Sequence, residues 1–216
     1  AHMDFDLGGP VFTGAVTAVD AGDLPCDPAD PAGARALIGR AVGQVLDAGA
    51  VPLLLGGDDS VPLPMLGAFG GRGRRFTILQ IDAHIDWRDE VQGERLGLSS
   101  TMRRASEMAH VERIIQVGAR GIGSARPGDV ADARAWGVEF VTAAEVARGG
   151  VGPVLALIPD GAEVIVCLDC DALDPAIMPA VIGRTAGGLS YWQVLDLIAG
   201  AAARGRIAGF DMVEFM

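Results

Sequence analysis

Short apolar runs alternate with helix-like stretches along most of the 216 residues. The runs are almost continuously hydrophobic, as expected for strands whose two faces are both covered by helices. They predict strands over Val16–Asp20, Val51–Leu55, Phe76–Ile81, Arg113–Val117, Glu139–Val141, Val164–Leu168 and Ile207–Val213.

Helix signals lie between these strands. Asp30 is placed to cap a helix that has Pro31 as its first residue, and Ser190 is placed to cap the last helix. The predicted helices are Pro31–Ala48, Val61–Phe69, Thr101–His110, Asp129–Trp136, Val151–Leu157 and Tyr191–Ala203. Strand–helix–strand alternation predicts a mainly parallel sheet between two helical layers, which is a three-layer αβα domain of the α/β class.

The composition narrows the function classes. Half of the chain is hydrophobic (50%), enough for a sizeable core, but no apolar stretch reaches the ~20 residues of a membrane span. The net charge of -11 disfavours nucleic acid and anionic membranes as partners. All 17 basic residues are Arg. The absence of Lys excludes Schiff-base chemistry, pyridoxal-phosphate enzymes and a P-loop.

The chain contains three cysteines, which are too few for a disulfide framework and suit a reducing compartment. A cytoplasmic location is therefore expected. Cys167 and Cys170 have C-x-x-C spacing but lie in the strand-like run "EVIVCLDCD". Because positions three apart on a strand face opposite sides, we predict two ordinary thiols rather than a shared metal or redox site.

Acidic residues follow the ends of four predicted strands. Ligands of open parallel sheets bind beyond the carboxyl ends of the strands. In an extended chain, positions i and i+2 share a face, so Asp82, His84 and Asp86 can point into one site. The full set is Asp58 and Asp59; Asp82, His84 and Asp86; Asp169, Asp171 and Asp174; and Asp211 and Glu214.

Any single one of these acids is as well explained by a helix cap or a solvated loop charge. Gathered at one edge, however, the carboxylates would repel each other and take up protons unless cations were bound among them. Oxygen ligands with one imidazole suit Mn²⁺ better than a thiolate-preferring metal. The pattern predicts a metal cluster of two ions.

The same residues resemble the signature blocks of the ureohydrolase family, which comprises arginases, agmatinases and guanidino-acid hydrolases. "GGDDS", "DAHID" and "CLDCDALDP" are similar to the blocks G-G-D-H-S, D-A-H-x-D and S-x-D-x-D-x-x-D-P. Weaker likenesses in "VDAGDLP", "IIQVGARG", "GGLSYWQVLDLI" and "GFDMVEF" extend the resemblance from about Val16 to the last residue.

The resemblance implies an arginase-like fold, two Mn²⁺ ions per chain, and hydrolysis of a guanidino group to urea and an amine. The implied substrate is a small molecule of the agmatine or guanidino-acid type. Family members are generally trimers or hexamers, so a homo-oligomer is expected. Because they also continue at both ends, residues 1–216 are expected to be a single ureohydrolase-like domain that lacks parts of the family's terminal segments.

Site residues also follow from the resemblance. The implied metal ligands are Asp59, Asp82, His84, Asp86, Asp169 and Asp171, with Asp86 and Asp169 bridging both ions. Asp174 would support the site from behind, and Glu214 would pair with the substrate guanidinium. A metal-bridging hydroxide would attack the guanidinium carbon, and Asp86 would pass a proton to the departing amine.

Three positions depart from the family pattern. Asp59 stands where the family has a histidine ligand; a carboxylate can still bind Mn²⁺, but its charge should raise the pKa of bound water. Leu96 stands where the family often has a proton-shuttling histidine, and it cannot carry a proton. Arg184 lies in a loop that differs from the family's, where it either meets a substrate carboxylate or stays on the surface.

These departures leave three functions open. The first is a metal-dependent amidinohydrolase, which accounts for the retained ligand set and for Glu214 together. The second is a non-catalytic or weakly active ureohydrolase-like subunit with an impaired metal site, which supports a partner chain. The third is another metal-dependent hydrolysis on the same fold, such as deacetylation or deformimination.

Overall fold

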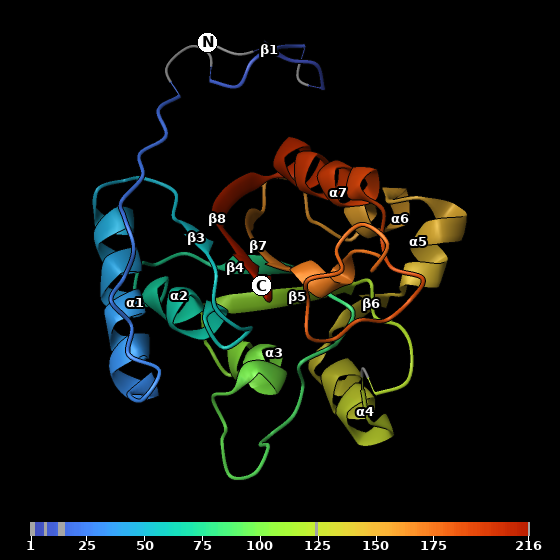
Figure 1. The fold of residues 1–216 in the computed structure, drawn as a ribbon, viewed down its shortest axis with the longest axis horizontal. Helices are drawn as coiled ribbons and strands as arrows, with labels where there is room; N and C mark the ends of the chain where they lie inside the picture. Colours follow the sequence, from blue (N-terminus) through green and yellow to red (C-terminus); the bar gives the residue numbers. More distant parts are fainter. Residues whose placement is uncertain (1–2, 7, 13–15, 124, 216) are drawn as a thin grey trace.

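A six-stranded parallel sheet forms the centre of the molecule (Figure 1). The computed structural model describes residues 3–6, 8–12, 16–123 and 125–215. Across the sheet, the strands are β3 (Leu53–Leu55), β8 (Arg206–Val213), β7 (Glu163–Asp169), β4 (Phe76–Ile81), β5 (Val111–Val117) and β6 (Glu139–Val141). All six residues of β4 are buried, because β7 and β5 flank it and helices cover both of its faces.

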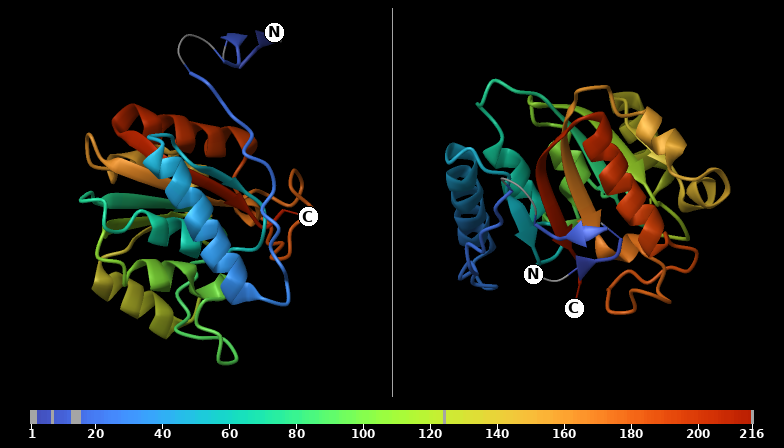
Figure 2. Two further views of the ribbon diagram at one scale, coloured as in Figure 1. Left: turned by 90° about the vertical axis from the view of Figure 1, so that its left-hand side faces the viewer. Right: turned by 90° about the horizontal axis from the view of Figure 1, so that it is seen from above.

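Seven α-helices occur in the described residues, and Figure 2 shows them on both sides of the sheet. They are α1 (Pro31–Asp47), α2 (Pro62–Ala68), α3 (Thr101–Ala105), α4 (Pro127–Trp136), α5 (Ala143–Gly149), α6 (Gly152–Ala156) and α7 (Tyr191–Arg204). Two single 3₁₀ turns, η1 (Leu98–Ser100) and η2 (Cys170–Ala172), also occur. A separate pair of two-residue strands, β1 (Met3–Asp4) and β2 (Gly9–Pro10), lies near the N-terminus.

Alternate residues of the strands enter two different cores. Ile78 and Ile114 face one core, to which α1, α2, α3 and α4 contribute. Their neighbours Leu79 and Ile115 face the other, which α5, α6 and α7 cover. The period of two along a strand therefore supplies both faces of the sheet with apolar side chains. The predicted three-layer α/β architecture is confirmed.

Both predicted helix caps are confirmed. The side chain of Asp30 accepts a hydrogen bond of 2.9 Å from the Gly33 amide at the start of α1. Ser190 Oγ accepts one of 3.2 Å from the Gln193 amide at the start of α7. Each cap satisfies one of the amides that the first helical turn leaves without a partner.

Some predicted elements differ from the structure. The strand Val16–Asp20 is wrong: this segment forms no strand, and Val16 and Val19 are 68% and 81% exposed. A strand needs a neighbour for its backbone groups, and no described strand pairs with this segment. Helix α3 ends at Ala105 instead of His110. Helix α5 was missed, although Thr142 and Glu145 form a capping box before it.

Two further features concern the cysteines and the apolarity of the helices. Cys167 and Cys170 are buried free thiols. Cys167 lies in β7, but Cys170 lies in η2 just beyond the end of that strand, so the predicted placement of both cysteines in one strand is wrong. Across the described part of the chain, none of the helices combines the length and apolarity that crossing a membrane would require.

Candidate metal centre

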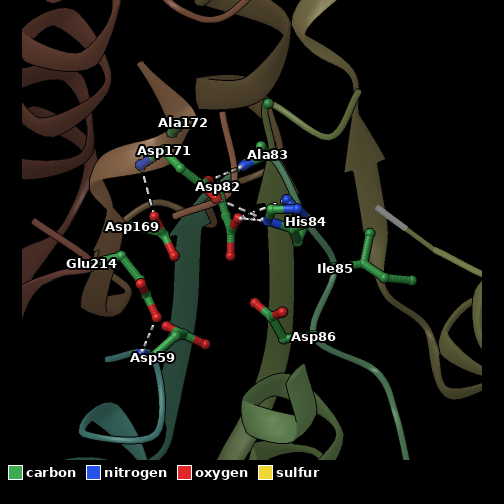
Figure 3. Close-up of polar contacts among 12 residues, drawn as sticks. Asp59, Asp82, Ala83, His84, Ile85, Asp86, Asp169, Asp171, Ala172 and Glu214 are labelled. Carbon is green, nitrogen blue, oxygen red and sulfur yellow. Dashed lines mark hydrogen bonds and ion pairs between the residues drawn. The ribbon is translucent and has the colours of Figure 1, made fainter. Parts of the chain in front are cut away.

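The carboxyl ends of β3, β8, β7 and β4 meet at one rim of the sheet, and the predicted acids gather there. Figure 3 shows the side chains of Asp59, Asp82, Asp86, Asp169 and Glu214 pointing toward a common space. These five side chains come from the ends of four strands that are far apart in the sequence. All five residues are at most 8% exposed.

Two groups of potential ligand atoms overlap at Asp82. The first comprises Asp82, His84 and Asp171, and the second comprises Asp59, Asp82 and Asp169. Within each group, the ligand atoms lie within 4.8 Å of one another. Two adjacent groups of this kind fit two divalent cations, with oxygen atoms as the main donors.

Asp86 lies beside these groups without belonging to either. Its Oδ2 accepts a hydrogen bond of 2.7 Å from Gln80 Nε2, and the same nitrogen donates to Asp82 Oδ2 at 2.6 Å. The residue common to both groups is thus Asp82, whereas the family resemblance assigned bridging to Asp86 and Asp169. The bridging roles stay predictions.

His84 is held between two acids. Its Nδ1 lies 3.0 Å from Asp171 Oδ2 and 3.4 Å from Asp82 Oδ1. The hydrogen bonds to Asp171 and then to Asp82 raise the pKa of His84 to about 11. A cation that bound to these three residues would replace the imidazole proton as the positive partner of the carboxylates.

Burial and mutual repulsion shift the acids toward their neutral forms. Burial, followed by the charge of Asp82, raises the pKa of Asp169 to about 10. Burial also raises the pKa of Asp59, with added repulsion from Asp82 and Asp169, and Asp59 Oδ2 has no hydrogen-bond partner. A buried carboxylate oxygen without a partner, among other acids, fits a cation site.

Asp171 behaves differently. Burial is the largest single influence and raises its pKa, but the hydrogen bond and charge of His84, together with the hydrogen bond from the Ala83 amide, lower the pKa overall. Its other oxygen, Oδ1, accepts a hydrogen bond of 3.1 Å from the Ala83 amide. The Asp171 amide in turn donates to Asp169 Oδ1 at 2.7 Å. The contact with Ala83 ties the end of β7 to the end of β4.

Glu214 stands on the opposite side of the group from His84. Its Oε1 accepts a hydrogen bond of 3.1 Å from the Asp59 amide. Glu214 and Asp86 have positive φ angles of 60° and 44°, in the left-handed region that non-glycine residues seldom occupy. Such conformations concentrate at functional sites, and here they occur where both strands β8 and β4 give way to loops.

A cavity of about 240 Å³ opens over the acids. Its lining residues are Asp59, His84, Ile85, Asp86, Trp87, Arg88, Leu98, Ser99, Gly123, Asp129, Asp169, Asp171, Ile182, Gly183 and Glu214. Several of the singled-out positions are not among them, including Asp82, which is 1% exposed, and also Leu96 and Arg184. Leu96 is 37% exposed in the loop before η1, and Arg184 is exposed on the surface.

Asp174 also lies outside the lining and holds the loop that borders the cavity. Its Oδ1 accepts from the Ala176 amide at 2.9 Å, and its Oδ2 accepts from the amides of Gly187 and Gly188 at 2.9 and 3.0 Å. These hydrogen bonds lower the pKa of Asp174. The contacts agree with a supporting role behind the site.

Arg120 has a supporting role that the sequence did not suggest. Its guanidinium donates to the carbonyl oxygens of Asp171 (2.7 Å), Ala172 (3.2 Å) and Thr185 (2.8 Å). It therefore joins η2 to the loop that carries Ile182 and Gly183. The sequence feature that could have indicated this role is the position of Arg120 in "GARG", directly after β5.

Two buried glutamines were missed as well. Gln80 and Gln116 are direct partners in the pairing of β4 with β5, and each is 1% exposed. Gln116 Nε2 donates to Gln80 Oε1 and, at 2.7 Å, to the Ile85 carbonyl. This pair directs the Gln80 amide at Asp82 and Asp86. The sequence feature that could have indicated them is one amide side chain, Gln80 or Gln116, in each of two otherwise apolar strands.

The comparisons with known proteins agree with this geometry. Residues 2–216 match the sequence pattern of the arginase family. The chain belongs to the arginase family. This match confirms the ureohydrolase resemblance.

The arginase-family chain is similar to several curated proteins. It is 30% identical to a guanidinobutyrase of Pseudomonas aeruginosa over 205 residues, covering 93% of the chain and 64% of that protein. It is 30% identical to an agmatinase of Bacillus anthracis, covering 90% of the chain and 66% of that protein. The chain thus spans just under two thirds of the length of these relatives.

Solved structures show the same fold. An arginase from Medicago truncatula superimposes with a TM-score of 0.76 at 30% identity, covering 86% of the chain and 58% of that protein. A formimidoylglutamase from Bacillus subtilis superimposes with a TM-score of 0.87 over 98% of the chain and 68% of that protein. At 24% identity, the latter likeness supports the fold alone.

Proposed function

We propose that this arginase-family chain hydrolyses the guanidino group of a small molecule, either agmatine or a guanidino acid, to urea and an amine. The observation that carries the proposal is the pair of ligand groups that share Asp82. Members of both groups line one cavity together with Glu214. In this reaction, the water oxygen becomes the urea oxygen. The C–N bond to the substrate chain breaks, and the amine nitrogen leaves with an added proton.

Mn²⁺ is the metal that fits the donors best, because they are carboxylate oxygens and one imidazole. The first group, Asp82, His84 and Asp171, would hold one ion, and the second, Asp59, Asp82 and Asp169, would hold the other. When bound, such ions supply Lewis acidity and lower the pKa of water.

Glu214 is suited to orient the substrate. Its Oε1 is fixed by the Asp59 amide, and its backbone conformation turns the residue away from the line of β8. A carboxylate in this position pairs with the planar, forked N–H groups of a guanidinium through charge-assisted hydrogen bonds. Such pairing presents the guanidinium carbon to the acids in one orientation.

Asp86 is suited to carry the proton. Its Oδ2 accepts from Gln80, which leaves Oδ1 to hold a proton. Burial, followed by repulsion from Asp59, raises the pKa of Asp86, which favours its protonated form. A group of this kind can protonate the amine as the C–N bond breaks.

The test is urea release by the purified chain with Mn²⁺ from agmatine, 4-guanidinobutyrate, 3-guanidinopropionate and arginine. We expect urea from at least one compound, and no urea above background from the Glu214→Gln variant. If protein with two bound Mn²⁺ ions per chain forms no urea from any of the four, the proposal is wrong.

The second candidate, a non-catalytic subunit that supports a partner chain, draws on two observations. Asp59 adds a buried negative charge to the second ligand group, and Leu96 supplies no proton carrier. The number of Mn²⁺ ions bound per chain separates the two candidates. About two favours the enzyme, and one or none favours the subunit. The trimer or hexamer stays a prediction, for which light scattering is the measurement.

A further inference from the structure

An ion pair lies in the lining of the same cavity. Arg88 Nη1 is 2.8 Å from Asp129 Oδ2, and the two side chains are 19% and 20% exposed. Both residues line the cavity together with Glu214. Among the described lining residues, Arg88 is the one with a permanent positive charge.

The pair is held in place from both sides. The Arg88 amide donates to the Ser99 carbonyl at 2.9 Å, which fixes the backbone two residues after Asp86. Asp129 belongs to the first turn of α4 and accepts a hydrogen bond of 3.3 Å from the Arg126 amide in a capping arrangement. Arg88 is thus oriented before any ligand binds, which reduces the entropy lost on binding.

Asp129 offsets the charge of Arg88, but the remaining N–H donors of Arg88 suit an anion. A guanidinium carries five N–H donors in a planar fork that matches a carboxylate, and the described side-chain contact of Arg88 uses only Nη1. A substrate whose guanidinium is at Glu214 extends its other end into the rest of the cavity. A carboxylate at that end is attracted by Arg88, whereas an ammonium group is repelled by it.

We propose that Arg88, oriented by Asp129, binds a carboxylate at the far end of the substrate, so that the chain prefers guanidino acids to agmatine. This inference rests on the proposed function and names the substrate class for the same cavity. The sequence left Arg184 as either a substrate-carboxylate contact or a surface residue, and the structure places it exposed and outside the cavity lining. Arg184 therefore supplies a matched control.

The experiment compares KM and kcat for 4-guanidinobutyrate and for agmatine in three proteins: the wild type, Arg88→Met and Arg184→Met. We expect wild-type kcat/KM to be higher for 4-guanidinobutyrate. Arg88→Met should raise KM for 4-guanidinobutyrate about 10- to 100-fold, the range expected for loss of a charge-assisted contact. Its kcat for that compound should change less, and KM for agmatine should stay the same or fall. Arg184→Met should match the wild type for both compounds.

A purely structural ion pair predicts something else, namely that Arg88→Met impairs both substrates to the same extent. That result would overturn the inference, as would a wild type that prefers agmatine. Arg88→Lys adds a further check, because it keeps the charge but loses the fork; it should recover part of the lost affinity for 4-guanidinobutyrate.

Failure of the proposed function is distinguishable from failure of this inference. If wild-type protein releases urea from neither compound, the carboxylate contact is tested by binding alone. Mn²⁺-loaded wild type and Arg88→Met are then titrated with each compound by calorimetry. Binding of 4-guanidinobutyrate weakened at least tenfold by Arg88→Met, with agmatine binding unchanged, supports the carboxylate contact. Equal binding of 4-guanidinobutyrate by the two proteins refutes it.

Discussion

Replacing Asp211 with Asn should remove a pH-dependent loss of stability from the metal-free protein. Asp211 lies in β8 and is 0% exposed, and neither of its carboxylate oxygens has a hydrogen-bond partner of good geometry. Burial raises its pKa from 3.8 to about 7, although the nearby Cys167 thiol and Leu168 amide offset part of the effect. The site therefore resists a negative charge at this position.

The magnitude follows from the pKa difference. A change from 3.8 to about 7 corresponds to about 4 kcal/mol, because each pKa unit is worth about 1.4 kcal/mol. The folded protein keeps the Asp211 proton up to about pH 7, whereas the unfolded chain releases it near pH 3.8. Between these values the folded state binds more protons, so stability falls as pH rises. The loss is absent below the lower pKa and complete above the upper one.

Asn does not ionise, so the variant escapes this loss. The free energy of unfolding of Asp211→Asn minus that of the wild type should increase by about 4 kcal/mol between pH 4 and pH 8. Any constant cost of burying the amide cancels in this comparison across pH. The assay is urea denaturation of chelator-treated protein at several pH values, with the exposed Asp196→Asn as control. Parallel curves for wild type and Asp211→Asn would refute the reasoning.

Three further perturbations test the surroundings of the site. Gln80→Met removes the donor shared by Asp82 and Asp86, so calorimetry should show about 10- to 100-fold weaker Mn²⁺ binding. The control is Thr77→Val, a buried change on the same strand, which should leave the Mn²⁺ affinity unaltered. An Mn²⁺ affinity of Gln80→Met equal to that of the wild type would count against a positioning role for Gln80. Asp59→His removes one negative ligand charge, which should lower the pKa of water bound to the metal. The acidic limb of the pH profile of kcat/KM should therefore move about one pH unit lower. A limb at the same pH in both proteins would contradict this. Arg120→Met leaves several carbonyl oxygens without their hydrogen-bond donor, so urea denaturation should show a free energy of unfolding lower by about 3 kcal/mol. A decrease of less than about 1 kcal/mol would show that water replaces the guanidinium as the donor.

Local sequence determined most of the secondary structure and the composition of the acidic rim. The central strands were recognisable because β4 and β7 are buried on both faces and therefore almost continuously apolar. The caps at Asp30 and Ser190 act within a single helical turn, so short-range spacing was sufficient to predict them. Asp82 and His84 are also close in the sequence, so their proximity could be predicted before the fold was known, although the chain bends at Ala83 and His84 and the His84 amide donates to Asp82 Oδ1 at 2.6 Å.

Tertiary structure decided the features that depend on distant partners. Val16–Asp20 has the composition of a strand, but pairing with another strand requires a neighbour, and none of the described strands provides one. Gln80 meets Gln116 only through the register of β4 with β5. The packing of α4 brings Asp129 to Arg88, whereas Arg184 lies exposed in the loop before α7. The sequence by itself specified which residues could bind cations. The fold determined which arginine lines the cavity, because contacts between distant segments exist only after the layers have packed.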